Sequence, residues 1–140
     1  MFTLHTEDFR LELSLQVFEA DISYPENAIL RIKVVSDGFS ADTTMDIDGK
    51  AFAAFAKDLL RLYRTLSGTA RLEEPYGTQD YLEFEAAARG GVLVRGSLHS
   101  GGRGGYRQAL SFENGFDQTF LRDFARELAA WGPSPDGSGH

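Results

Sequence analysis

Apolar and polar residues alternate over long stretches of this chain. From Phe9 to Val17 every odd position is apolar and every even position is polar. This period of two is typical of a β-strand that buries one face and exposes the other. The alternation returns over 30–34 and 39–47, on either side of Asp37-Gly38, a pair that favours a tight hairpin turn. The first half is therefore expected to form antiparallel strands.

The apolar phase changes after the first of these strands. Ala20, Ile22 and Tyr24 place apolar residues at even positions, so a turn or bulge near Phe18-Glu19 must reset the register. With a turn at Pro25-Glu26-Asn27, the first half predicts four strands, over 9–17, 20–24, 30–34 and 39–47. The strand over 9–17 could be an edge strand that pairs between subunits, and Phe39 is expected to point inward with the other odd residues of the fourth strand.

A helical period replaces the alternation twice. The first apolar stripe steps by three and four residues, with Asp48 placed to cap its start and Gly68 to cap its end. The second stripe follows Asp117, another possible cap. The two stripes consist of Phe52, Phe55, Leu59, Leu62 and Leu66, and of Leu121, Phe124, Leu128 and Trp131.

The second half repeats the plan of the first. Four further strands are predicted around Leu72, over 82–86, over 92–98 and over 106–112, with Asn114-Gly115 ending the last. The segments 55–59 and 124–128 correspond at an offset of 69 residues, which indicates a duplication or a chance match between two amphipathic helices.

The expected fold is α+β. It has about eight mostly antiparallel strands in one curved or two packed sheets and two amphipathic helices, with a possible β4-α-β4-α internal repeat. Residues 1–131 are expected to form a single domain, and 132–140, which lack apolar side chains, a disordered Pro/Gly/Ser tail.

Composition excludes several classes of function. The 140 residues include 14 basic and 21 acidic side chains, for a net charge of −7, and no cysteine. Nucleic-acid binding needs a basic face, and disulfides, zinc–thiolate sites and a cysteine nucleophile need cysteine, so we expect none of these. No apolar run approaches the roughly 18–20 residues of a membrane span, and 1–8 do not resemble a signal peptide. We therefore expect no membrane partner and a cytoplasmic location.

The candidate catalytic motifs are weak. Residues 46–50 resemble the start of a calcium loop, but Thr44 and Phe55 stand where ligands are needed, so a strand end with a helix cap explains them better. The glycines of 101–105 lack the lysine of a phosphate-binding loop. His99 shares the outward face of its strand with Arg95 and Ser97 and has no second histidine or triad partner nearby. Glu83 and Glu85 also point outward from one strand face, where a glycosidase-like pair would need a cleft. We expect no catalytic residue, metal site or cofactor.

The distribution of the acidic residues is more informative. Residues 73–85 contain five carboxylates and no basic residue, with Tyr76 and Tyr81 among them, and 37–48 contain four aspartates and no basic residue. Acidic surface with interleaved tyrosine suits docking onto a basic protein, because charge raises the encounter rate and aromatic rings supply buried contact area. The alternative is that this acidity only aids solubility.

Two short motifs carry a family resemblance. Leu72-Glu73-Glu74-Pro75-Tyr76, followed by Tyr81-Leu82-Glu83-Phe84-Glu85, resembles a segment of the WapI-type immunity proteins and related uncharacterised bacterial families, and the order of elements over 8–131 is also similar. Those small bacterial proteins are encoded beside contact-dependent toxins and act by binding. The resemblance implies a non-enzymatic protein that neutralises a cognate toxin stoichiometrically.

The residues expected to contact that toxin come from the acidic segment that carries the motifs. They are Glu73, Glu74, Tyr76, Asp80 and Tyr81. The alternative function is a housekeeping or small-ligand-binding α+β domain with no toxin partner, and the oligomeric state stays open.

Overall fold

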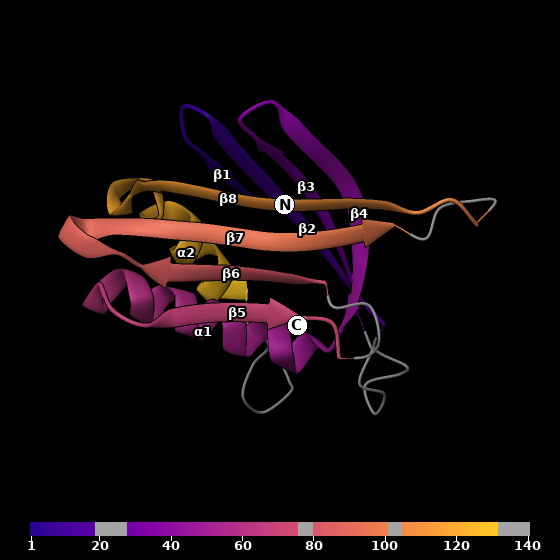
Figure 1. Ribbon diagram of the computed structural model, residues 1–140. Helices are drawn as coiled ribbons and strands as arrows, with labels where there is room; N and C mark the ends of the chain where they lie inside the picture. The colour runs from indigo at the N-terminus through magenta and orange to yellow at the C-terminus, as the bar shows by residue number, and fades with distance from the viewer. Residues whose placement is uncertain (19–27, 76–79, 101–104, 132–140) are drawn as a thin grey trace.

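The strands form two four-stranded antiparallel sheets, each followed along the chain by a helix (Figure 1). The computed structural model describes residues 1–18, 28–75, 80–100 and 105–131. The first sheet contains β1 (Phe2–His5), β2 (Phe9–Val17), β3 (Ala28–Ser36) and β4 (Phe39–Ile47), and leads into α1 (Gly49–Thr65). The second contains β5 (Thr69–Glu73), β6 (Tyr81–Ala86), β7 (Gly91–Ser100) and β8 (Gln108–Asp117), and leads into the 3-10 helix η4 (Gln118–Phe120) and α2 (Arg122–Trp131). The α+β class and the repeated element order are confirmed, and the sheets are two.

Strand order follows chain order in both sheets. The β3–β4 hairpin turns at the predicted dipeptide, where Asp37 (φ 47°) and Gly38 (φ 87°) both adopt left-handed backbone conformations. Two consecutive left-handed residues are characteristic of the type I′ turn, whose twist matches that of the flanking strands.

The N-terminal edge of the first sheet differs from the prediction. β1 was not expected, because four residues are too few for alternation to stand out. It pairs with β2, placing Leu4 opposite Leu11. Because β3 pairs with its other side, β2 is an interior strand at Arg10–Leu13 and not the edge strand that the sequence suggested. The predicted strand over 20–24 and the tail over 132–140 lie outside the described residues, as do the turn at 25–27 and four of the five residues of 101–105.

The last strand also differs from its predicted bounds. β8 begins at Gln108, after Tyr106, and continues through Asn114-Gly115 to Asp117. The prediction that Asn114-Gly115 ends this strand is wrong, because Asn114 has a partner across the core. Its side-chain amide nitrogen donates to the hydroxyl of Ser36 on β3 at 3.0 Å, which joins the two sheets.

The helix caps are partly as expected. The Asp48 carboxylate accepts a hydrogen bond from the backbone N–H of Lys50 at 2.9 Å and caps α1. The predicted C-cap at Gly68 is wrong: Leu66 adopts the left-handed conformation (φ 55°) and donates its N–H to the carbonyl of Leu62. Asp117 accepts hydrogen bonds from the N–H and the hydroxyl of Thr119. These bonds lower the pKa of Asp117 and start the helical segment that ends in α2.

The two helices bury matching positions. Phe55, Ala56 and Leu59 of α1 are buried, and so are the residues found 69 positions later, Phe124, Ala125 and Leu128 of α2. The short sequence correspondence between the halves therefore falls on structurally equivalent core positions.

Both sheets direct one face into a shared core. In Figure 1 the second sheet faces the viewer, with the first sheet and α2 behind it and α1 alongside β5. The ring of Phe84 on β6 lies 6.1 Å, between centroids, from Phe55 of α1 and equally far from Phe124 of α2. Phe9 of β2 lies 6.0 Å from Phe112 of β8. The opposite face of the second sheet is thereby left to solvent.

Phe39 is the exception to the inward pattern of β4. It is 70% exposed, so the prediction that it points into the core is wrong. It is the first residue after the hairpin turn, on an edge strand that no described element covers there.

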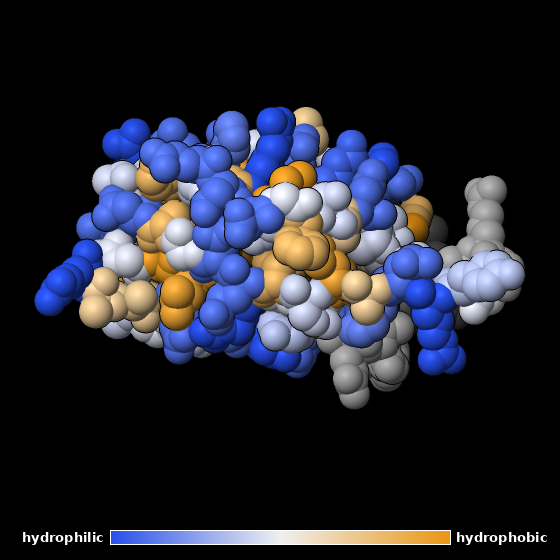
Figure 2. All heavy atoms as spheres, turned by 45° about the horizontal axis from the view of Figure 1, so that its top comes forward, coloured by the Kyte–Doolittle hydropathy of each residue, from blue (hydrophilic) through white to orange (hydrophobic). Residues whose placement is uncertain are grey.

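Figure 2, which brings the top of the Figure 1 view forward, shows a mostly hydrophilic surface with hydrophobic side chains gathered near its middle. Exposed apolar side chains such as that of Phe39 are common on protein surfaces.

Candidate functional site

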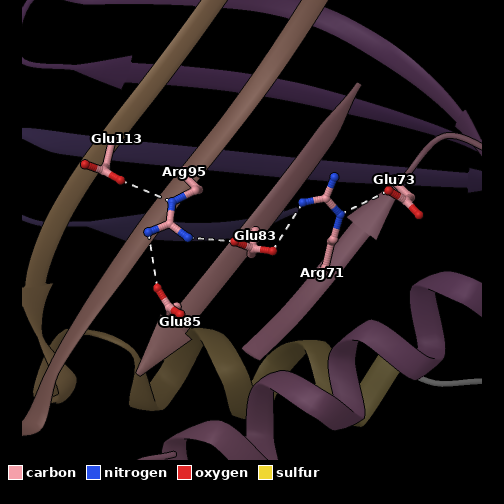
Figure 3. A network of polar contacts seen from close by, with 6 residues as sticks. All are labelled: Arg71, Glu73, Glu83, Glu85, Arg95 and Glu113. Atoms are coloured by element: carbon pink, nitrogen blue, oxygen red, sulfur yellow. Dashed lines mark hydrogen bonds and ion pairs between the residues drawn. The ribbon is translucent and has the colours of Figure 1, made fainter. Parts of the chain in front are cut away.

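A row of alternating charge crosses the outer face of the second sheet. The strand register places Arg71 of β5 opposite Glu83 of β6, Glu83 opposite Arg95 of β7, and Arg95 opposite Glu113 of β8. Arg95 donates to Glu83 at 2.7 Å and to Glu113 at 3.1 Å, and Arg71 donates to Glu83 at 3.2 Å. Figure 3 shows all four side chains reaching along the face toward one another.

Two further carboxylates complete this network. Glu85 accepts from Arg95 at 3.2 Å, and Glu73 accepts from Arg71 at 3.0 Å. The network therefore joins two guanidinium groups to four carboxylates and keeps an excess of two negative charges. The sequence prediction that the acidic residues of 73–85 are unopposed is wrong, because their basic partners come from β5 and β7.

The network shifts the pKa of its central members, Glu83 and Arg95. The Glu83 side chain is only 17% exposed. Burial acts to raise the pKa of this carboxyl, but the hydrogen bonds and charges of Arg95 and Arg71 outweigh it and hold the pKa below its usual range. The three carboxylates around Arg95 raise its pKa further. Both shifts favour the charged forms of Glu83 and Arg95.

The second acidic segment, 37–48, also contains an aspartate that is paired with an arginine. Asp42 of β4 receives two hydrogen bonds from Arg31 of β3, at 3.1 and 2.9 Å, and Asp48 is used as the cap of α1. The guanidinium of Arg31 lowers the pKa of Asp42. The prediction that 37–48 lacks opposing charge is therefore wrong for Asp42, whose basic partner lies on the neighbouring strand.

Four of the five predicted contact residues converge at one end of the charged row. Glu73, Glu74, Asp80 and Tyr81 line an open depression of about 320 Å³, together with Arg71 and Ser97. The guanidinium carbon of Arg71 lies 4.1 Å from the centroid of the Tyr81 ring, within the range of a cation–π contact. The fifth predicted residue, Tyr76, lies outside the described residues.

Asp80 is more buried than an acidic surface residue, whereas His99 is exposed as predicted. Asp80 is 2% exposed, so its side chain adds almost no accessible surface to the predicted contact region. Its Oδ1 lies 2.6 Å from Nδ1 of His99, whose own side chain is 43% exposed. Alternation could have indicated the burial of Asp80, because it is in phase with the inward Leu82 and Phe84.

Other kinds of site have no support in the described part of the chain. No group of three or more His, Asp or Glu residues within it is arranged to hold a metal ion. Its helices are too short or too polar to cross a membrane. In the described residues, the outer face of the second sheet offers an acidic surface, the ring of Tyr81, and the guanidinium of Arg71 that lies over this ring.

Comparison with known proteins identifies the family. No curated protein matches this chain. The family described as the immunity protein WapI-like family matches residues 2–131, which include both sheets and both helices. The chain therefore belongs to the WapI-like immunity protein family.

Proposed function

We propose that this protein neutralises a cognate toxin by stoichiometric, non-enzymatic binding in the bacterial cytoplasm. Membership of the WapI-like immunity protein family is the observation that carries this proposal. The contacts proposed are Glu73, Glu74 and Tyr81, together with Tyr76. Asp80 supports the surface from below, because its carboxylate is buried against His99.

The chemistry of the depression favours a basic partner surface. Arg71 already shows how a guanidinium binds there: it lies over the ring of Tyr81 and donates to Glu73 and Glu83. A lysine or arginine of the toxin would meet the same combination of carboxylates and an aromatic face. The excess of two negative charges in the network would attract that surface over several ångströms before contact.

The shape of the depression supports a protein partner over a small ligand. Small-molecule sites are usually enclosed and mainly apolar, with few polar groups. The depression at Tyr81 is open and is lined by four charged side chains, those of Arg71, Glu73, Glu74 and Asp80. The open, charged depression therefore favours binding of a toxin protein over binding of a small ligand.

The first test is functional. The protein encoded immediately upstream is expected to be toxic when expressed alone and harmless when this chain is co-expressed. Failure to protect the cells, or the absence of a toxic neighbour, would argue for the housekeeping alternative.

The second test locates the surface. The double substitution Glu73→Gln and Glu74→Gln should slow association with the toxin by about tenfold at low salt and reduce its salt dependence. The matched control is Asp123→Asn with Glu127→Gln on α2, which removes the same charge from two exposed side chains, one of them also paired to an arginine. Equal effects of the two double variants would show that only net charge matters and would refute this location.

A further inference from the structure

One pair of polar side chains lies at the start of β6, outside the charged network. Asp80, which immediately precedes β6, is 2% exposed and meets His99 of β7 at 2.6 Å. Burying a carboxylate is costly unless a donor compensates for the lost water. A histidine ring nitrogen can supply such a donor, and Nδ1 of His99 is the side-chain atom within hydrogen-bond distance of Asp80 Oδ1.

The backbone of Asp80 is fixed as well. Its carbonyl accepts a hydrogen bond from the N–H of Glu74 at 3.1 Å. The next residue, Tyr81, pairs with Glu73 at the last register position between β5 and β6. Asp80 therefore links the end of β5 to β7: its backbone carbonyl binds Glu74, and its side chain binds His99.

These contacts adjoin the depression. Asp80 lines the depression together with Glu73, Glu74 and Tyr81. The contact between Asp80 and His99 is polar, and the His99 side chain is 43% exposed. Losing the bond between them should therefore loosen the end of β5 and the start of β6 while leaving both sheets assembled.

We infer that His99 is a positioning residue for the docking surface: by holding Asp80 it fixes Glu74 and Tyr81 in the arrangement that a basic partner contacts. This inference rests on the proposed function for the identity of the partner. The anchoring itself can be measured on the protein alone.

The experiment compares three variants. His99→Ala removes the donor, His99→Asn keeps a side-chain N–H close to the Nδ1 position, and His5→Ala removes the exposed histidine of β1 as a control. The readouts are hydrogen exchange at the amide of Glu74 and the rate of dissociation from the toxin domain. The amide of Asp37, which donates to the carbonyl of Asp8 in the first sheet, is the internal reference.

The alanine variant should speed exchange at Glu74 by about tenfold or more, because a hydrogen bond to a charged group is lost, and leave Asp37 unchanged. Toxin dissociation should speed by a similar factor. His99→Asn should restore both quantities, and His5→Ala should change neither. Restoration by asparagine is the result that a role in packing alone does not predict.

Several results would overturn the inference. They are unchanged exchange at Glu74 in His99→Ala, faster exchange with an unchanged rate of toxin dissociation, and no restoration by asparagine. If the wild-type protein binds no toxin while exchange at Glu74 rises in the alanine variant as expected, the proposed function fails and the anchoring by His99 is supported.

Discussion

Gly96, in the middle of β7, offers a sharp test of how the second sheet packs. It is buried and lies opposite Phe112 of β8 in the register, with the Phe112 ring over it. A Cβ at this position would lie 2.7 Å from Cζ of Phe112 and 2.8 Å from the backbone oxygen of Tyr81. Ordinary carbon contacts are about 3.5–4.0 Å, so two atoms must move by about 0.7 Å or more.

Only one of these atoms moves easily. The Phe112 ring can tilt, but the oxygen of Tyr81 belongs to the backbone of β6, next to Leu82, the residue opposite Gly96. Overpacking of this kind costs about 1–3 kcal/mol. The lower entropy of an alanine chain in the unfolded state offsets about 0.4–1 kcal/mol. Gly96→Ala should therefore lower the free energy of unfolding by about 1–2 kcal/mol, or the melting temperature by roughly 3–10 °C.

A second glycine provides the control. Gly115 lies on β8, and a Cβ there would meet its nearest atom, Cδ2 of Leu93, at an ordinary 3.4 Å. Gly115→Ala should be neutral or stabilise by up to about 1 kcal/mol. Urea unfolding of both variants, followed by circular dichroism, measures the difference. Equal stabilities would refute the close packing of Phe112 and Tyr81 around Gly96.

Four other predictions test separate parts of the fold. Phe84→Ala should cost about 3–5 kcal/mol in urea unfolding, because its ring packs between both helices. Asn114→Leu removes the donor to the 5%-exposed Ser36 and should cost about 1–3 kcal/mol, whereas Ser36→Ala with Asn114→Leu should recover part of that loss. Asp48→Ala should cost about 0.5–2 kcal/mol, and Asp48→Ser much less, because serine can still cap α1. Folding lowers the pKa of Glu83, so the Glu83 carboxylate stabilises the fold at pH values above its ordinary pKa of 4.5. This stabilisation is lost as the pH falls through the lower pKa of the folded state. Glu83→Gln should therefore flatten the dependence of the melting temperature on pH between pH 3 and 7.

Periodicity predicted most of the fold because each long strand buries a single face. The first three odd residues of β2 and most of both helical stripes are buried as expected, and Asp48 and Asp117 cap where predicted. Val17 and Leu66, which were expected to point inward, are 39% and 40% exposed. The incorrect predictions occur where the local sequence is too short to show a period or is compatible with more than one structure. Four residues of β1 are too few to show a period, and Asn114-Gly115 resembles a turn until Ser36 on the other sheet accounts for the asparagine.

The candidate site was predictable in position but not in electrostatics. The motif residues Glu73, Glu74 and Tyr81 do meet at one depression. The two arginines of the charged network lie on β5 and β7, outside the segment 73–85, so counting charges along that segment could not reveal the ion pairs. Arg95 meets Glu83 only through a strand register that composition does not specify. The Asp80–His99 contact likewise joins residues 19 positions apart.

The most direct test of the central claim is a titration of the toxin encoded by the neighbouring gene. Its activity should be measured as this protein is added, with the heat of binding recorded in parallel. Stoichiometric neutralisation predicts that activity falls linearly and ends at one equivalent, where the heat also saturates, and that Glu73→Gln with Glu74→Gln weakens both. Full inactivation by a small fraction of an equivalent would indicate an enzyme, and no heat with undiminished activity would contradict toxin binding.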